Sequence, residues 1–385
     1  PDMATERNEE TAIGEEPWGN YNRIMLSPVL SGEKTIDDIM LHPHAWYSDK
    51  GIKFIADDPA IKIDRTRKTV HTEKGETVDY DRLIIATGSK PFIPPVQGVD
   101  LKGVISFRDI YDVNTMIKYC ETKKNAVVIG GGLLGLEAAY GLKQRGMNVT
   151  VLHLMDRIME RQLDGRASRM LRHSIEEKGI KIITEANTEA LIGKNGHVSQ
   201  IRLKDGTLLD ADLVVFAVGI RPNITLAQSA GLRCNRGILV NDTMQTFDPS
   251  IYAVGECIEH RNQTFGFVEP LWGQAFICAS HLAEHGSLTF KSPTVPTQLK
   301  VSGVDVFSAG NFEPKEDYED IILNDEKRHI YKRIIIQKDK VIGAVLFGDT
   351  EDGMWYAELI ADQTPVSTFR NKLLFGKDFA LKKAG

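Results

Sequence analysis

A short glycine-rich run could bind the phosphates of a dinucleotide. It lies between an apolar segment, 126–129, and a helical pattern that ends near residue 145. In a strand–turn–helix of this kind, one glycine permits the tight turn, one lets the backbone approach a pyrophosphate, and one lets helix and strand pack closely. The N–H groups at the helix N-terminus would bind the phosphates. We therefore predict a dinucleotide site, with a purely structural turn as the alternative, at Gly130, Gly132, Leu133, Leu134 and Gly135.

The end of the next predicted strand, 148–152, bears on which dinucleotide fits. An acidic residue at that point would bind the ribose 2′-hydroxyl of NAD. This sequence has His153 there, followed by Asp156 and Arg157. Because no carboxylate stands at that position to repel a 2′-phosphate, the choice between NADH and NADPH stays open. A solvent-exposed strand end is the alternative role for His153.

The composition is that of an ordinary globular protein. The 385 residues exceed what one core usually serves, so we expect two or three domains. A net charge of −6 argues against nucleic-acid binding, which needs clustered Lys and Arg. The most apolar run, 126–142, is short for a membrane span and contains glycines and Glu137. We therefore expect neither a nucleic-acid nor a membrane partner.

Four cysteines are spread along the chain without a CxxC pair. This spacing argues against zinc, iron–sulfur and dithiol redox sites. His42 and His44 have no evident third ligand, so we predict no metal site. Isolated reduced thiols, together with an acidic N-terminal segment unlike a signal peptide, indicate a cytoplasmic protein.

Three further segments consist of an apolar strand pattern followed by small residues: 80–89 ("YDRLIIATGS"), 211–223 ("ADLVVFAVGIRPN") and 251–257 ("IYAVGEC"). In this order around the glycine run, they resemble the two-dinucleotide flavoprotein reductases of the glutathione-reductase-like superfamily. The resemblance implies an α/β protein with two Rossmann-like domains, with FAD and NAD(P)H as cofactors. It implies an FAD-binding domain at 1–110 and 242–292, an NAD(P)H-binding domain inserted at 111–241, and a small α+β C-terminal domain at 293–385.

A narrower resemblance rests on 18–41, 131–143, 236–246 and 299–310. These segments are similar to the N-terminal reductase region of the assimilatory nitrite reductase large subunit, and to the electron-transfer subunit of assimilatory nitrate reductase. The resemblance implies hydride transfer from NAD(P)H to FAD, and electron delivery to a redox partner protein or to a downstream iron–sulfur and siroheme module. A rubredoxin or ferredoxin reductase, or an NAD(P)H oxidase, is the alternative enzyme. The oligomeric state, including a homodimer, stays open.

The sequence departs from that family in two places. Members begin with a strand, a glycine turn and a helix that bind the FAD pyrophosphate, whereas residues 9–16 resemble the second strand of that unit. We therefore expect either a fragment or an incomplete flavin site, and a nucleotide-binding fragment without flavin activity is a third hypothesis. The cysteine-rich iron–sulfur and siroheme regions of the family are also missing, so we expect the chain to deliver electrons rather than to reduce nitrite itself.

The resemblance also implies individual site residues. Arg23 and Glu137 are the predicted catalytic residues, Glu137 in the first turn of the nucleotide helix and between nicotinamide and flavin. The alternatives are a surface salt bridge for Arg23 and a helix-dipole acid for Glu137. Gly219 joins the NAD(P)H contacts. The implied FAD contacts are Glu15, Glu16, Arg23, Leu26, Ser27, Ala86, Thr87, Gly88, Gly255, Glu256, Glu269, Pro270, Leu271 and Trp272, with a core position as the alternative for Trp272.

The C-terminal part has the alternation of apolar and polar residues that is typical of antiparallel strands. The segments 303–310 and 329–348 show it, and 338–340 suits a hairpin turn. Residues 351–362 have a helical pattern. By the resemblance, this domain covers the flavin edge and contributes to partner docking.

Overall fold

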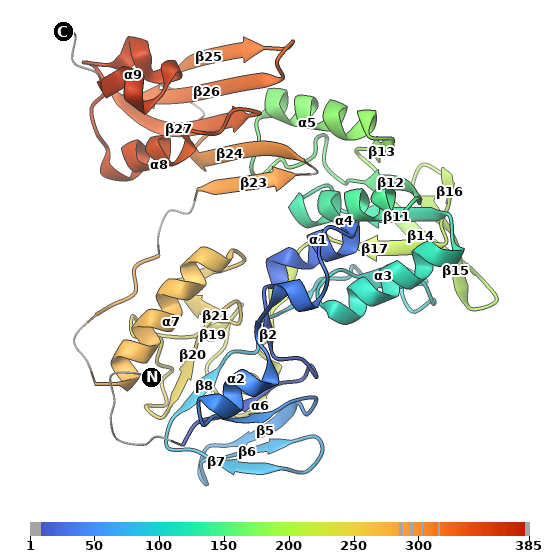
Figure 1. Cartoon of the computed structure of the whole chain (residues 1–385), viewed down its shortest axis with the longest axis vertical. Helices are drawn as coiled ribbons and strands as arrows, with labels where there is room; N and C mark the ends of the chain where they lie inside the picture. The colour runs from blue at the N-terminus through green and yellow to red at the C-terminus, as the bar shows by residue number, and fades with distance from the viewer. Residues whose placement is uncertain (1–8, 285–287, 293–295, 302, 315, 382–385) are drawn as a thin grey trace.

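The computed structural model describes residues 9–284, 288–292, 296–301, 303–314 and 316–381. Within them the chain is a mixed α/β protein that divides into three structural units (Figure 1). We call these the parallel-sheet unit (104–216), the N-terminal unit (9–91 and 220–282) and the C-terminal unit (297–381).

The parallel-sheet unit is built on five parallel strands in the order β10-β17-β11-β12-β13. Its helices α3, α4 and α5 connect successive strands, which is the right-handed pattern of a nucleotide-binding sheet. The predicted strand–turn–helix–strand is confirmed as β11, α4 and β12, because apolar runs of four or five residues alternate with an amphipathic helix. The elements are β10 (Val104–Ser106), α3 (Ile110–Thr122), β11 (Asn125–Ile129), α4 (Leu133–Gln144), β12 (Asn148–Leu152), α5 (Gly165–Glu177), β13 (Ile180–Ile183) and β17 (Leu213–Phe216). An antiparallel sheet adjoins them, made of β14 (Thr188–Lys194), β15 (His197–Leu203) and β16 (Leu208–Asp210).

The N-terminal unit consists of small sheets and short helices. Two parallel pairs, β1 with β4 and β8 with β20, are not hydrogen-bonded to each other within the described residues. Within the described residues, β1 and β8 therefore each have one edge without a strand partner. The strands are β1 (Thr11–Ile13), β2 (Asn20–Tyr21), β3 (Met40–His42), β4 (Lys53–Ile55), β5 (Ala60–Asp64), β6 (Thr69–Thr72), β7 (Thr77–Asp79), β8 (Leu83–Ile85), β9 (Ser89–Pro91), β18 (Ile220–Pro222), β19 (Ile238–Leu239), β20 (Ile251–Ala253), β21 (Ile258–His260) and β22 (Gln263–Thr264).

The helices of this unit are short except for the last one. They are α1 (Leu26–Ser31), α2 (His44–Asp49), α6 (Thr225–Ser229) and α7 (Val268–Leu282), with 3₁₀ turns η1 (Arg23–Met25) and η2 (Asp37–Ile39). Helix α7 begins at Val268, so it carries the predicted FAD contacts Glu269, Pro270, Leu271 and Trp272 in its first turns. One separate apolar core lies among β8, β20, β21 and α7.

The C-terminal unit is a five-stranded antiparallel sheet in the order β23-β24-β27-β26-β25. Its elements are β23 (Thr297–Val301), β24 (Val304–Gly310), β25 (Glu319–Asp325), β26 (Ile330–Gln337), β27 (Lys340–Phe347), α8 (Gly353–Asp362), η3 (Arg370–Phe375) and α9 (Lys377–Leu381). Lys338 and Asp339 both have positive φ, which is the geometry of the two-residue turn that favours a tight hairpin. The predicted hairpin and helix are confirmed.

Both faces of this sheet are covered. Along β27, Val345 and Phe347 belong to the core that contains α4 and α5, whereas Ala344 and Leu346 face the core beneath α8. Burial on both sides explains why β27 is nearly continuously apolar rather than alternating. Figure 1 shows this unit beside α5, at the opposite end of the molecule from the small strands β5, β6 and β7.

Candidate functional site

The glycine run forms a turn with one open position. A Cβ added at Gly130 would lie 2.2 Å from the Ala217 carbonyl oxygen, and one at Gly135 would lie 1.9 Å from the Gly130 carbonyl oxygen. These two glycines therefore permit close backbone packing. A Cβ at Gly132, the N-cap of α4, would meet no atom within 4 Å. The space above the helix N-terminus is open at the residue where a phosphate would approach.

His153 lies beneath this turn and is buried, with 9 % of its surface exposed. The Gly131 N–H donates to His153 Nδ1 over 3.0 Å. Because Nδ1 accepts, the neutral ring carries its proton on Nε2, which lies 3.1 Å from Glu160 Oε2 and donates to it. The alternative of a solvent-exposed strand end is wrong. Both ring nitrogens have protein partners, so a ribose contact by His153 stays a prediction.

The loop after β12 is bound back to the same turn. The Met159 N–H donates to the Gly131 carbonyl oxygen over 2.9 Å. Two hydrogen bonds therefore join this loop and the strand end to Gly131, on the peptide next to the open position at Gly132.

Ser27 and Glu137 meet where α1 packs on α4. Gly141 of α4 permits the contact, because a Cβ there would lie 2.7 Å from Leu30 Cγ. Ser27 Oγ donates to Glu137 Oε2 over 2.6 Å. Since α4 begins at Leu133, Glu137 lies in the second turn, and its predicted first-turn position is wrong. Burial raises the pKa of the Glu137 carboxyl, and the Ser27 bond opposes that rise.

Arg23 is held by protein groups on two sides. Its Nη2 donates to Glu16 Oε1 over 2.7 Å, and its Nη1 donates to the Arg108 carbonyl oxygen over 2.8 Å. Tyr21 donates to the second oxygen of Glu16 over 2.6 Å. Of the two acids predicted to contact FAD, Glu16 is therefore hydrogen-bonded within the protein, whereas Glu15 is exposed. Leu26 is 3 % exposed, and its side chain belongs to the core with α4.

Glu256 forms a polar cluster that joins distant segments. Ser89 Oγ donates to its Oε2 over 2.8 Å, and Arg108 Nη2 donates to the same oxygen over 2.5 Å. Arg108 was not among the predicted site residues. The signal that could have found it is a basic residue at the crossover between the two predicted domains, directly before the α3 N-cap Asp109.

The turn after β8 is bound to Asn223, directly after β18. Thr87 Oγ1 donates to the Asn223 carbonyl oxygen over 2.7 Å, and the Asn223 N–H donates to the Gly88 carbonyl oxygen over 2.8 Å. Gly88 and Gly219 both have positive φ, as their turns require. Ala86 is exposed beside them. A Cβ at Gly219 would meet no atom within 4 Å.

The turn after β20 also carries an open glycine, together with an unpaired hydrogen-bond donor. Gly255 has a φ of 93°, and a Cβ there would meet no atom within 4 Å. Its N–H donates to Gln274 Oε1 over 2.7 Å. Gln274 is fully buried, and its Nε2 has no hydrogen-bond partner in the described part of the chain. Gln274, which sequence analysis missed, therefore presents an unsatisfied donor beside an open cradle.

The start of α7 is mixed in exposure. Trp272 is 68 % exposed, so the core alternative is wrong, and Pro270 is buried. Glu269 is exposed and Leu271 is half-buried. At the other helix, Leu133 is half-buried and Leu134 is exposed. Their predicted cofactor contacts stay predictions.

Comparison with known families shows which class of protein the open turns at Gly132 and Gly255 are part of. Residues 3–274 match the family described as pyridine nucleotide-disulphide oxidoreductase. The chain belongs to this family. Residues 296–364 match the family described as rubredoxin NAD+ reductase C-terminal domain. As a pyridine nucleotide-disulphide oxidoreductase, the chain belongs to a class whose cofactors are FAD and NAD(P)H, and the open glycines at 132 and 255 fit such groups.

Curated relatives of this oxidoreductase include two from Bacillus subtilis (strain 168). The chain is 47 % identical to a nitrite reductase [NAD(P)H], over 95 % of its own length and 45 % of the relative's. It is 42 % identical to an assimilatory nitrate reductase electron transfer subunit, over 94 % of its own length and 47 % of the relative's. The chain thus spans less than half the length of these relatives.

The fold is similar to that of NADH:rubredoxin oxidoreductase from Clostridium acetobutylicum. The TM-score is 0.80 at 28 % identity, covering 95 % of this chain and 92 % of that one. The similarity includes the C-terminal unit, because nearly the whole of both chains is covered.

The described residues of this oxidoreductase contain no group of three or more His, Cys, Asp or Glu placed to hold an ion. All four cysteines lie in the described part and are unpaired with one another. No described helix is long and apolar enough to cross a membrane.

Proposed function

We propose that this chain transfers a hydride from NAD(P)H to FAD and delivers the electrons to a separate redox acceptor of nitrite or nitrate assimilation. This proposal rests mainly on one observation: the residues that follow the strands of the motifs 80–89, 211–223 and 251–257 are hydrogen-bonded to one another. Thr87 is bonded to Asn223, directly after β18, and Ser89 is bonded to Glu256 after β20. These bonds join segments of the N-terminal unit that are far apart in sequence, and Arg108 of the parallel-sheet unit also donates to Glu256.

The proposed organisation is an FAD-binding domain at 1–110 and 242–292, an NAD(P)H-binding domain at 111–241 and a C-terminal domain at 293–385. The open glycines 132 and 255 support this organisation, because Gly132 belongs to the parallel-sheet unit and Gly255 to the N-terminal unit, one for each proposed cofactor. Residues 1–8, at the start of the proposed FAD domain, lie outside the described residues.

Each set of residues has a distinct role in this proposal. The N-terminus of α4, open at Gly132, receives the nucleotide phosphates. Gly255 and the orphaned Nε2 of Gln274 face the FAD. When bound, FAD would supply the hydride acceptor and the route for electrons to leave. Glu137, held by Ser27, and Arg23, held by Glu16, are proposed to line the space between the two cofactors.

The partner in this proposal is a redox protein or an iron–sulfur and siroheme module. The name of the nitrate reductase electron transfer subunit, 42 % identical to this chain, supports an electron-delivering role. A rubredoxin-type acceptor is the second candidate, since residues 296–364 match the C-terminal domain of rubredoxin reductases. A cytoplasmic location and a homodimer are left as predictions.

An absorption spectrum of the chain with added FAD, from 300 to 550 nm, tests the proposal. Under nitrogen, NADH or NADPH should bleach the flavin band, and ferricyanide should restore it. The Gly132→Ala variant is the matched control, because its Cβ fills only the open space. Bleaching in the chain but not in this variant supports the proposal.

Three other outcomes would favour the competing functions. Rapid oxygen consumption would favour an oxidase, and reoxidation by rubredoxin faster than by a siroheme module would favour a rubredoxin reductase. Failure to bind FAD would favour a nucleotide-binding fragment without flavin activity.

A further inference from the structure

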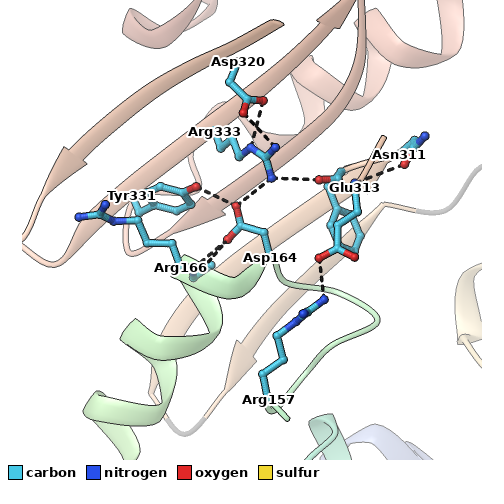
Figure 2. Close-up of polar contacts among 10 residues, drawn as sticks. Arg157, Asp164, Arg166, Asn311, Glu313, Asp320, Tyr331 and Arg333 are labelled. Atoms are coloured by element: carbon cyan, nitrogen blue, oxygen red, sulfur yellow. Dashed lines mark hydrogen bonds and ion pairs between the residues drawn. The ribbon is translucent and has the colours of Figure 1, made fainter. Parts of the chain in front are cut away.

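Asp164 is a shared anchor for a helix and for the C-terminal unit. Its Oδ1 caps α5 by accepting from the Ala167 N–H over 2.9 Å and from the Arg166 N–H over 3.1 Å. Its Oδ2 accepts from Tyr331 Oη over 2.7 Å and from Arg333 Nη1 over 3.2 Å. Figure 2 shows these donors converging on the carboxylate from β26 on one side and α5 on the other. One buried carboxylate therefore joins the two units.

Other hydrogen bonds hold the Arg333 guanidinium in place beside Asp164. Its Nε and Nη2 donate to both oxygens of Asp320 at 3.1 and 3.0 Å (Figure 2). Its Nη1 also donates to the Phe312 carbonyl oxygen at 3.1 Å. Tyr331 is 2 % exposed and belongs to the same core as Leu163. Both donors are thus held by packing or by other bonds.

The other end of the same loop has a second contact with the C-terminal unit. We define the nucleotide loop as residues 153–164, between β12 and α5. Within it, Arg157 Nη2 donates to Glu313 Oε1 over 2.6 Å (Figure 2). The middle of the loop is bound to the glycine turn by the Met159 N–H bond to the Gly131 carbonyl oxygen.

The nucleotide loop is therefore bound on two sides. One side contacts the glycine turn next to the open position at Gly132. The other side contacts the C-terminal unit at Arg157 and at Asp164. In a sheet of this topology, the end of the second strand and the residues after it lie on the side that receives the adenosine ribose.

We infer that the C-terminal unit is a structural part of the nucleotide site, with Tyr331 and Arg333 as positioning residues that hold the nucleotide loop where it receives the adenosine half of NAD(P)H. This inference rests on the proposed nucleotide site at α4, but not on flavin chemistry. Tyr331 and Arg333 act on the nucleotide loop through their bonds to Asp164, not by direct hydrogen bonds to the glycine turn.

The test uses ADP-ribose, which contains the adenosine half and carries no redox chemistry. Its dissociation constant is measured by calorimetry on the full chain and on Tyr331→Phe, which removes one hydroxyl, and Arg333→Met. We expect ADP-ribose to bind about 5-fold and about 10-fold more weakly, respectively. Hydrogen exchange of the amides of residues 154–163 should quicken in both variants.

Two controls separate positioning from general damage. Arg202→Met removes an ion pair with Glu189, at 2.6 Å, on the exposed β14–β15 hairpin of the parallel-sheet unit, which also contains the nucleotide loop. It should leave ADP-ribose binding within twofold and loop exchange unchanged. Arg333→Lys keeps a cation near Asp164 and should recover part of the affinity lost in Arg333→Met.

Each remaining outcome counts against the inference or for it. Unchanged affinity despite faster loop exchange, or unchanged exchange, would overturn it. A chain that does not bind ADP-ribose would overturn both the inference and the proposed nucleotide site. A chain that binds ADP-ribose as expected but whose flavin is not reduced would overturn only the proposed function. If Arg333→Met does not fold, Tyr331→Phe alone decides.

Discussion

Two glycines of one turn have opposite reasons to be glycine. A Cβ at Gly135 would lie 1.9 Å from a backbone oxygen, so Gly135→Ala should destabilise the fold by more than about 2 kcal/mol. A Cβ at Gly132 meets nothing within 4 Å, so Gly132→Ala should keep the stability within about 0.5 kcal/mol. Only the second variant should weaken NADH binding, by tenfold or more, while its urea unfolding curve stays unchanged. Equal destabilisation in both variants would contradict this division of roles.

Asp112 should make stability fall as the pH rises. Burial raises the pKa of Asp112 to about 6, and the neighbouring Asp109 adds to the rise. An acid whose pKa is higher in the folded state stabilises the fold below its unfolded pKa of about 4, and this contribution is lost between pH 4 and 6. Asp112→Asn cannot titrate, so at pH 7 it should be more stable than the parent chain by on the order of 1 kcal/mol. The gain should vanish at pH 4, as measured by urea unfolding.

Asp38 is the control of opposite sign. Hydrogen bonds from the backbone and side chain of Thr35 lower the pKa of this exposed carboxyl. A lowered pKa stabilises the fold above the unfolded pKa and is lost as the pH falls. Asp38→Asn should therefore lose stability relative to the parent chain at pH 7 but not at pH 3. Parallel pH profiles for Asp112→Asn and Asp38→Asn would show that neither shift governs stability.

Helices α3 and α5 both begin with an aspartate N-cap, but only the cap of α5 also bonds to another unit. Asp109 caps α3 by accepting from the Asp112 N–H over 2.9 Å. Asp164 caps α5 and also accepts from two side chains of the C-terminal unit. We expect Asp109→Ala to cost about 1 kcal/mol of unfolding free energy. Asp164→Ala should cost about 3 kcal/mol, because it leaves a buried Tyr331 hydroxyl and Arg333 without that acceptor. Urea denaturation compares them, and equal costs would remove the cross-unit role of Asp164.

The whole molecule has cores that do not follow the order of the chain. Residues of α4, α5, β26 and β27 share one core, whereas β8, β20 and α7 enclose another. Native-state hydrogen exchange in low urea should therefore show β12 and β27 opening together, with β20 opening separately. Opening of β27 well before β12 in the parent chain would mean that the C-terminal unit unfolds alone. In the Arg333→Met variant, we expect β27 to open earlier relative to β12 than it does in the parent chain.

The sequence by itself determined the local elements. Apolar runs of strand length at 126–129, 148–152 and 213–216, with glycine turns and a helical pattern between them, specify β11, β12, β17 and α4 because periodicity and turn chemistry are local properties. The hairpin at Lys338 and Asp339 and the helix α8 were predictable for the same reason. The order of the motifs along the chain also indicates the family.

Only the tertiary structure decided how these elements meet. It placed Arg108 beside Glu256, 148 residues away, and buried His153 between Gly131 and Glu160. It also bound β26 to the nucleotide loop through Asp164 and buried β27 between two apolar cores. Such pairings depend on which surfaces are left after local structure has formed, and many partners of the same charge or hydrophobicity compete for them. A single sequence shows the residue types that can pair, but the packing of the whole chain selects the pairs.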